Sequence, residues 1–316
     1  MTGMPSPQAR ETLGSDGFPD AIRSAFPFPA AVDPNLEQAL RHTLENPGSL
    51  IRPRLVMQIA AAYGLEAARA QDLAVALEYF HSASLLFDDL PCMDNASERR
   101  GAPCVHRVFG EAEAILAALA LINRAYALTW RAVAGCDAGK QSRILEFVED
   151  RLGVAGLLNG QSLDLQYASL PHTRETTERI ARGKTVALIR LTLVLPAMLG
   201  DAGRREIRLL EHIALLWGLA YQALDDLKDL LQGEDETGKT VARDVLLDRP
   251  NTAAVLGVGR AIGRVVKLVQ TGHSALRRLV PVRPGLAFLE ALGGKLQEEL
   301  AHICEGACSA AAGERR

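Results

Sequence analysis

Two clusters of aspartates are the residues of this sequence whose chemistry is easiest to identify. Each cluster follows a strongly apolar segment, and the members are Asp88, Asp89 and Asp94 in the first cluster and Asp225, Asp226 and Asp229 in the second. Magnesium prefers oxygen ligands, keeps several waters and is usually shared between one or two carboxylates and substrate phosphates. The two clusters therefore predict a site that holds a diphosphate through bridging Mg²⁺.

The spacing within each cluster decides how its carboxylates can meet. A helix turns by about 100° per residue, so Asp225 and Asp229 lie on one face, one turn apart. Asp88 and Asp94 do not share an ideal helix face, but Pro91 stands between them and must distort or end the helix. We expect this distortion to bring Asp94 back toward Asp88. A solvated helix face would explain one such cluster alone, whereas two together favour a site.

Basic side chains near the clusters could bind the same anion. Arg99 and Arg100 follow the first cluster, and a guanidinium can bind a phosphate through two parallel hydrogen bonds. Lys184 and Lys239 are candidate point charges, although a lone lysine is more often a solvated surface group. His81 lies two turns before Asp88 on a similar face, although a lone histidine there is more often a core residue.

The elements that must position these residues are predicted to be helices. Leu and Ala fill the apolar positions, aromatic residues make up only 5% of the chain, and one-turn spacings recur, which favours helices over strands. No convincing strand or interdomain linker is present. We expect a loose leader over residues 1–30 that partly packs on the body, one helical domain over 31–308 and a disordered tail over 309–316. The main expected helices run from about 68 to 88, 111 to 134, 141 to 158, 175 to 199 and 205 to 231.

Composition excludes several classes of function. The 316 residues carry a net charge of −3 and contain no long basic block, so nucleic acid is a poor candidate partner. The five cysteines form neither a disulfide framework nor a zinc pattern, which fits a reducing cytoplasm. No secretory signal is expected at the N-terminus. No apolar stretch was expected to reach the roughly 20 residues of a membrane span.

Five ordered motifs resemble those of the trans-isoprenyl diphosphate synthases, a polyprenyl synthetase family that includes bacterial geranylgeranyl and farnesyl diphosphate synthases. The resemblance covers roughly residues 36–260. Its motifs are the run 81–101 with both arginines, Phe109–Ala117, Gly160-Gln161 with Asp164, Lys184-Thr185, and the run from Gln222 through Asp229 to Gly238-Lys239, Asp244 and Arg249-Pro250-Asn251. The fold implied is all-α, with helices of one large isoprenoid synthase domain around a central apolar cavity.

The resemblance implies a magnesium-dependent prenyltransferase that joins isopentenyl diphosphate to an allylic diphosphate. Asp88, Asp94 and Asp225 would bind Mg²⁺ directly, and the other three aspartates would support them. The motifs also imply that the allylic diphosphate is held by Arg99, Lys184, Thr185, Gln222 and Lys239. Isopentenyl diphosphate would be held by Arg52, His81 and Arg100. The site near the first cluster would be oriented by Gln161 and Asp164.

Chain length is also implied by the resemblance. The product tail would grow along the helix before Asp88, where Ala83 and Ser84 are both small. In the family, a bulky aromatic at the position of Ala83 stops growth at fifteen carbons. Small residues there, together with the insert Leu90–Met93, resemble bacterial geranylgeranyl diphosphate synthases. We therefore expect a C20 product.

The isopentenyl site departs from the family pattern. Ser49 stands where the family usually carries a lysine, although Arg52 of the same motif is kept. Phe87, Ala102 and Ala118-Leu119 also differ from common family residues. Three readings follow: an active synthase, an inactive or weakly active partner subunit of a homologous synthase, and an enzyme that ionises an allylic diphosphate without coupling. Members of the family usually form homodimers, so the resemblance implies a homodimer, with a heteromer as the alternative.

Overall fold

The computed structural model describes residues 17–231 and 249–313, with side chains described as far as residue 305. The described residues are mainly helical, which confirms the all-α prediction, and their only strands are the two-residue β1 (Glu98–Arg99) and β2 (Ala102–Pro103). The helices are α1 (Phe18–Ser24), α2 (Pro34–Glu45), α3 (Ile51–Ala62), α4 (Ala67–Asp88), α5 (Val105–Phe109), α6 (Glu111–Val133), α7 (Ala138–Leu152), α8 (Leu157–Leu165), α9 (Arg174–Lys184), α10 (Val186–Leu199), α11 (Arg204–Leu231), α14 (Thr252–Leu256), α15 (Val258–Leu279) and α16 (Leu289–Gly313).

The chain divides into two compact units. The first contains residues up to Arg54 together with Ala67–Thr129, and the second contains Leu55–Glu66 together with the chain from Trp130 onward. The first aspartate cluster belongs to the first unit and the second cluster to the second unit. Each unit is described below by itself.

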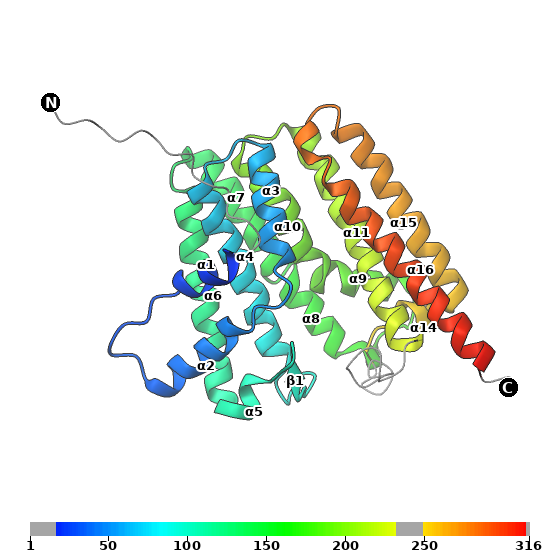
Figure 1. Ribbon diagram of the computed structural model, residues 1–316, viewed down its shortest axis with the longest axis horizontal. Coiled ribbons are helices and arrows are strands. Elements are labelled where there is room, and N and C mark those ends of the chain that lie inside the picture. The colour runs from blue at the N-terminus through cyan, green and yellow to red at the C-terminus, as the bar shows by residue number, and fades with distance from the viewer. Residues whose placement is uncertain (1–16, 232–248, 314–316) are drawn as a thin grey trace. The chain divides into compact units, whose positions relative to one another are not determined.

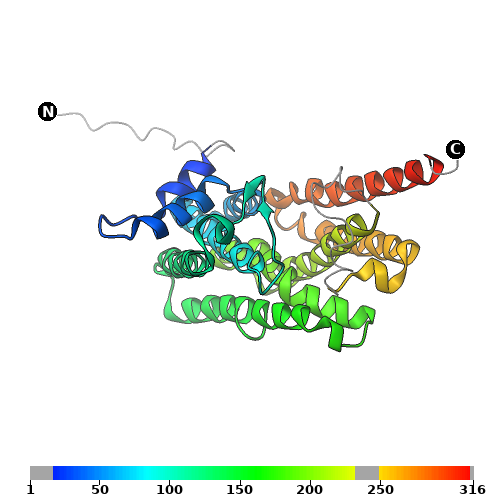
Figure 2. The ribbon, with the colours of Figure 1, turned by 90° about the horizontal axis from the view of Figure 1, so that it is seen from below.

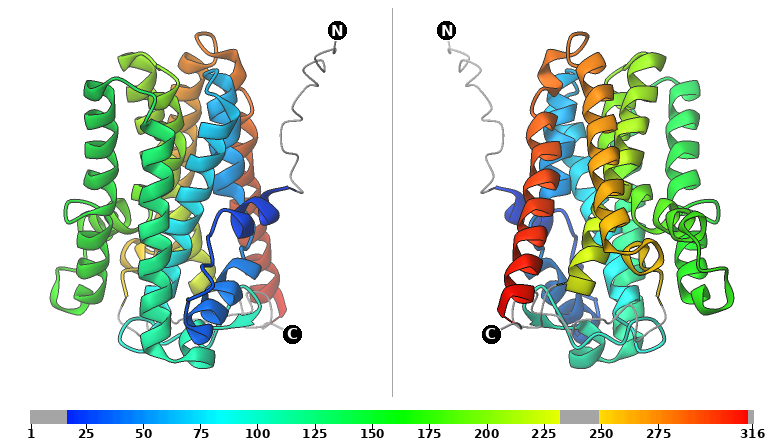
Figure 3. Two further views of the ribbon diagram at one scale, coloured as in Figure 1. Left: turned by 90° about the vertical axis from the view of Figure 1, so that its left-hand side faces the viewer. Right: turned by 90° about the vertical axis from the view of Figure 1, so that its right-hand side faces the viewer.

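In the first unit, α1 packs on α2 and α4 (Figure 3). Phe18 and Ile22 of α1 are buried, and the Tyr79 hydroxyl of α4 donates a hydrogen bond to the Ile22 carbonyl oxygen at 2.5 Å. Within the leader expected over residues 1–30, α1 packs on the body, because it buries apolar side chains and ties its backbone to α4. Residues 1–16 lie outside the described residues.

In the second unit, α11, α15 and α16 lie side by side (Figures 1 and 2). Their contact buries a continuous apolar core that includes Leu210, Ile213, Val265, Leu276 and Ile303. Helix α16 continues to Gly313 and so enters the segment from residue 309 that was expected to be a tail. The core holds α11 in place, and α11 carries the second aspartate cluster.

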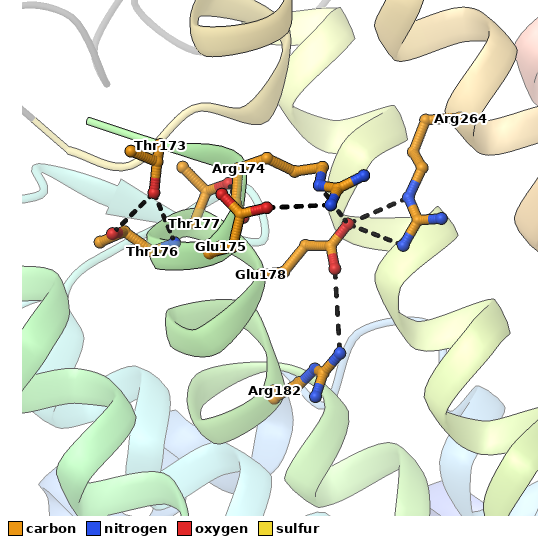
Figure 4. A network of polar contacts seen from close by, with 8 residues as sticks. All are labelled: Thr173, Arg174, Glu175, Thr176, Thr177, Glu178, Arg182 and Arg264. Atoms are coloured by element: carbon orange, nitrogen blue, oxygen red, sulfur yellow. Dashed lines mark hydrogen bonds and ion pairs between the residues drawn. The ribbon is translucent and has the colours of Figure 1, made fainter. Parts of the chain in front are cut away.

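Helix α9 is fixed at both its N-terminus and its side (Figure 4). The Thr173 side chain accepts a hydrogen bond from the Thr176 amide, which caps the helix. Glu178 of α9 lies 2.7 Å from Arg264 of α15, and Arg174 and Arg182 of α9 flank the same carboxylate. This network anchors the helix whose last residue is Lys184.

Two helices end earlier than the sequence predicted. The expected helix over 175–199 is divided at Thr185 into α9 and α10. The expected helix over 141–158 ends at Leu152, before Gly153 and Gly156, and the chain then forms the separate helix α8. Both breaks place predicted site residues at or near helix ends.

Helix α6 has an unexpectedly apolar sequence. By length and composition it could cross a membrane, so the expectation that no stretch is long enough was wrong. The core helices of soluble proteins pass the same test, and 39% of the apolar window is buried within the protein. Leu116, Leu119 and Tyr126 of α6 are each close to half exposed.

Candidate active site

The first aspartate cluster forms a compact turn at the end of α4. The Asp94 amide donates a hydrogen bond to the Asp88 carbonyl oxygen at 2.9 Å, and the Met93 amide donates to Leu90. The segment containing Pro91 therefore folds back on the helix end, as the sequence predicted. Asp88 and Asp94 are both half-buried, so their backbones are held close while their carboxylates keep access to solvent.

Asp89 has a different environment from its neighbours. Its side chain is buried, and one carboxylate oxygen accepts hydrogen bonds from the Arg99 Nε at 2.9 Å and Nη2 at 2.5 Å. Burial and the nearby Asp89 carboxylate together raise the pKa of the Cys104 thiol to about 12, so Cys104 stays protonated. Asp89 thus orients Arg99.

Arg99 and Arg100 lie on a tight hairpin. Strand β1 pairs with β2 in antiparallel register, and the two residues of the turn, Arg100 and Gly101, have φ angles of 56° and 77°. Positive φ at both positions is the backbone of a two-residue hairpin turn whose twist matches the strands. Arg100 is not glycine, so this conformation costs about 1 kcal/mol and must be held by other contacts.

The Arg100 side chain makes those contacts. Its Nη1 donates to the Asn46 carbonyl oxygen at 3.0 Å, and its Nη2 lies 3.3 Å from a carboxylate oxygen of Glu78 on α4. Gly48 adjoins the guanidinium so closely that a Cβ there would lie 2.6 Å from the Arg100 Nε. Sequence analysis missed Glu78, although an acid inside the apolar run of α4 is the kind of signal that could have found it.

The residues expected to bind isopentenyl diphosphate influence one another within the first unit. The pKa of His81 is lowered well below its usual value, first by burial and then by the positive charges of Arg52, Arg100 and Arg99. His81 is therefore neutral at physiological pH and can donate one hydrogen bond. Ser49, the position that usually carries a lysine, is exposed on the loop between α2 and α3.

The second aspartate cluster also combines exposed and buried carboxylates. Asp225 is exposed and Asp229 is half-buried, one turn further along α11. Asp226 is fully buried and accepts hydrogen bonds from the Gln222 Nε2 at 2.9 Å and the Thr252 amide at 2.7 Å. Burial raises the pKa of Asp226 to about 6 despite these donors. Asp226 joins Gln222 to the start of α14.

Lys184 and Thr185 lie at the break between α9 and α10, where both contact predicted site residues of the second unit. The Thr185 hydroxyl donates to the Gln222 Oε1 at 2.5 Å. The Lys184 Nζ lies 3.0 Å from a carboxylate oxygen of buried Asp164, and Arg249 lies 3.5 Å from the same oxygen. Asp164 is therefore shared by two cations, and Arg249, which the sequence placed in a family motif without a role, is one of them.

Close approach of two glycines positions this group. A Cβ on Gly160 of α8 would lie 2.3 Å from the Lys184 amide nitrogen, and a Cβ on Gly183 of α9 would lie 2.7 Å from the Gly160 Cα. Only residues without side chains allow the two helices to approach this closely. This approach sets Asp164 of α8 opposite Lys184 at the end of α9.

The remaining predicted residues are placed as follows. Gln161 is half-buried on α8, and Lys239 lies outside the described residues. Ala83 is fully buried, and the Ser84 hydroxyl donates to the His81 carbonyl oxygen at 2.8 Å. One turn before Ala83, the Phe80 ring contacts the Tyr126 ring of α6 edge to face, with centroids 4.9 Å apart.

The oxygen donors available within each unit suit magnesium. The described part of the chain contains no group of three or more metal-ligating side chains. Each cluster instead presents two carboxylates that are at least partly exposed: Asp88 and Asp94, or Asp225 and Asp229. Mg²⁺ normally takes only one or two carboxylates and completes its shell with water and substrate phosphate. The donor set therefore fits Mg²⁺ that is bound together with a phosphorylated substrate.

Comparisons with known proteins agree with this arrangement. A family model described as polyprenyl synthetase matches residues 33–264. The chloroplastic geranylfarnesyl diphosphate synthase of Leucosceptrum canum is 32% identical over 266 residues, 83% of this chain and 72% of that protein. The chloroplastic geranylgeranyl pyrophosphate synthase 3 of Arabidopsis thaliana is 33% identical over 252 residues, 76% of this chain and 70% of that protein.

A solved structure extends the likeness to the fold. The geranyltransferase of Helicobacter pylori, complexed with magnesium and isoprenyl diphosphate, superposes with a TM-score of 0.75 at 26% identity. The superposition covers 91% of this chain and 93% of that one. The predicted fold class is thereby confirmed.

Proposed function

The chain belongs to the polyprenyl synthetase family, and from that premise we propose that it condenses isopentenyl diphosphate with an allylic diphosphate to give a short-chain prenyl diphosphate. The observation that carries this proposal is that the chain has two aspartate clusters of the same kind, each with accessible carboxylates and a buried carboxylate that holds a neighbouring site residue. The buried carboxylates hold Arg99 and Gln222, both expected ligands of the allylic substrate.

The proposed reaction breaks the bond between the allylic carbon and its diphosphate. When bound, Mg²⁺ neutralises the charge that develops on the leaving diphosphate. Asp88, Asp94 and Asp225 would be the direct ligands, with Asp89, Asp226 and Asp229 in support. The allylic diphosphate would be bound by Arg99, Lys184, Thr185, Gln222 and Lys239, with Gln161 and Asp164 orienting the site.

The resulting allylic cation is attacked by the double bond of isopentenyl diphosphate. A carbon–carbon bond forms, and the departed diphosphate takes a proton from the former isopentenyl unit, which restores a double bond. Arg52, His81 and Arg100 would hold the second diphosphate, His81 as a neutral donor. The apolar segments that precede both clusters exclude water, which would otherwise quench the cation.

We propose a C20 product. The side chains of Ala83 and Ser84 are small, so they leave room for a product tail next to the first cluster. The Phe80–Tyr126 ring pair lies one turn further from the cluster. A tail that passes Ala83 would therefore meet aromatic rings next. The relatives named above make products of more than one length, so their names leave the length open.

A homodimer and a cytoplasmic location complete the proposal. The half-exposed apolar residues of α6, including Leu116 and Leu119, form a face that a second copy could cover. Light scattering after size exclusion tests this: a mass of twice 34.0 kDa supports the homodimer. A monomer would favour a homologous partner subunit, the alternative that the Ser49 departure raises.

The proposed chemistry is tested by condensation assays on matched aspartate variants. The Asp225→Asn variant should lose at least a hundredfold in turnover, because an exposed carboxylate proposed as a direct Mg²⁺ ligand is removed. Asp201→Asn makes the same change at a carboxylate whose side chain is 86% exposed, and should retain wild-type turnover. Equal turnover of the two variants would contradict the proposed role of the second cluster.

A further inference from the structure

The adjacent arginines of the hairpin are bound by different acids. Arg99 pairs with Asp89, which follows the last residue of α4, whereas Arg100 pairs with Glu78 inside the helix. The two acids are eleven positions apart, which corresponds to about 16 Å along a helix axis. The two guanidinium groups therefore extend in opposite directions along α4, so each can bind a different anion.

Arg100 is the more constrained of the two. Its backbone is held in the left-handed region at φ 56°, its Nη1 is bound by the Asn46 carbonyl oxygen, and its Nη2 faces Glu78. Gly48 leaves just enough room for its Nε. The Asn46–Gly48 loop leads directly to Ser49, which stands where the family usually carries a lysine. More of the binding of an anion here must consequently come from Arg100 and its neighbour Arg52.

We propose that Glu78 is a positioning residue that holds Arg100 toward the diphosphate of isopentenyl diphosphate and does not touch that substrate itself. The inference rests on the proposed function, which assigns the substrate to Arg52, His81 and Arg100. Glu78 lies one turn before His81 on the same face of α4, so a single helix face carries both the anchor of Arg100 and a direct ligand.

Burying this carboxylate is unfavourable for folding. Glu78 is 2% exposed, and burial raises its pKa to about 7 even though the charges of Arg100 and Arg52 lower it. A buried ion pair is often no more stabilising than apolar residues of similar volume. A strongly perturbed carboxylate beside two arginines and a half-buried histidine is instead typical of a functional site.

The test compares two changes that reach Arg100 from different sides. Glu78→Gln keeps the shape of the side chain but removes its charge. Gly48→Ala leaves Glu78 intact but places a methyl group against the Arg100 Nε, at a backbone position with φ 72°. Each should raise the KM for isopentenyl diphosphate about tenfold and leave the KM for the allylic diphosphate within twofold. If one variant fails to fold, as judged by its circular dichroism spectrum, the other still gives the test.

A control variant separates positioning from general damage. Glu206→Gln removes a comparable pair with Arg283 in the second unit, where the carboxylate side chain is 11% exposed, and should change neither KM. Calorimetric titration with isopentenyl diphosphate should show about tenfold weaker binding to Glu78→Gln and Gly48→Ala than to the wild type. An unchanged or lower KM and Kd for isopentenyl diphosphate, or equal rises in both KM values, would overturn the inference. Wild-type protein that makes no product would overturn the proposed function, while the calorimetric comparison would still decide the role of Glu78.

Discussion

Asp164 offers the most quantitative prediction, because one buried carboxylate holds two cations. Its side chain is 7% exposed, and the side chains of its partners Lys184 and Arg249 are 28% and 10% exposed. Asp164→Asn keeps the shape but removes the negative charge that Lys184 and Arg249 share. Removing one partner of a buried pair costs about 3–5 kcal/mol. Water can reach part of Lys184 and reduce that cost, so we expect the free energy of unfolding to fall by about 2–3 kcal/mol.

The assay is urea unfolding followed by circular dichroism, without Mg²⁺ or substrate. Asp201→Asn is the matched control, because Asp201 forms an ion pair with Lys140 but is largely exposed, and exposed pairs contribute about 0–1 kcal/mol. A double-mutant cycle of Asp164→Asn with Arg249→Gln should reveal a coupling of at least about 1 kcal/mol. If Asp164→Asn were no more destabilising than Asp201→Asn, the account of Asp164 as a shared anchor would be refuted.

Three further predictions concern the first unit. Ala83→Phe should shorten the main product from C20 to C15, because a ring would fill a fully buried position beside the first cluster; chromatography of the dephosphorylated products measures this, and an unchanged C20 product would contradict it. Ser49→Lys should lower the KM for isopentenyl diphosphate about tenfold or more, since a charge-assisted hydrogen bond contributes about 1.5–3 kcal/mol; an unchanged KM would show that residue 49 does not reach the substrate. A carboxyl whose pKa is raised on folding stabilises the protein below its unfolded pKa and loses that contribution as pH rises through the folded value. The pKa of Glu78 rises from 4.5 to about 7 on folding, so the stability of Glu78→Gln relative to the wild type should increase between these pH values, by at most about 3 kcal/mol. A difference in urea midpoint between the variant and the wild type that stays constant across this pH range would contradict the shift.

The long helices could be predicted because their apolar residues recur at helical spacing. The expected ranges of α4, α6 and α11 differ from the observed bounds by one residue at most. The return of Asp94 toward Asp88 was also predictable, since a proline inside the cluster cannot continue the helix. In these parts, local sequence and tertiary structure favour the same conformation.

The division of α9 from α10 at Thr185 could not be read from the sequence. Lys184, Thr185 and Val186 contain no helix breaker, so the local pattern favours one continuous helix. The observed break accompanies the Thr185–Gln222 hydrogen bond and the approach of Gly160 to Gly183, both of which are tertiary contacts. The separate helix α8 was missed for a related reason, because a nine-residue helix gives a weak periodic signal.

The roles of individual acids could be predicted only in part. Sequence spacing grouped Asp89 with Asp88 and Asp226 with Asp225, but it does not reveal that the second member of each pair is buried and hydrogen-bonded to protein. Glu78 was missed, and the pairing of Arg249 with Asp164 was not predicted, because the partners Arg100 and Asp164 are distant in sequence. Burial and pairing of this kind depend on which helices meet.

Product analysis of the purified protein tests the central claim most directly. The protein would be incubated with Mg²⁺, isopentenyl diphosphate and, in parallel, C5, C10 and C15 allylic diphosphates, and the prenyl products would be separated by length. The account predicts a prenyl diphosphate from at least one primer, with C20 as the end product. Folded protein that forms no prenyl product from any primer would contradict it.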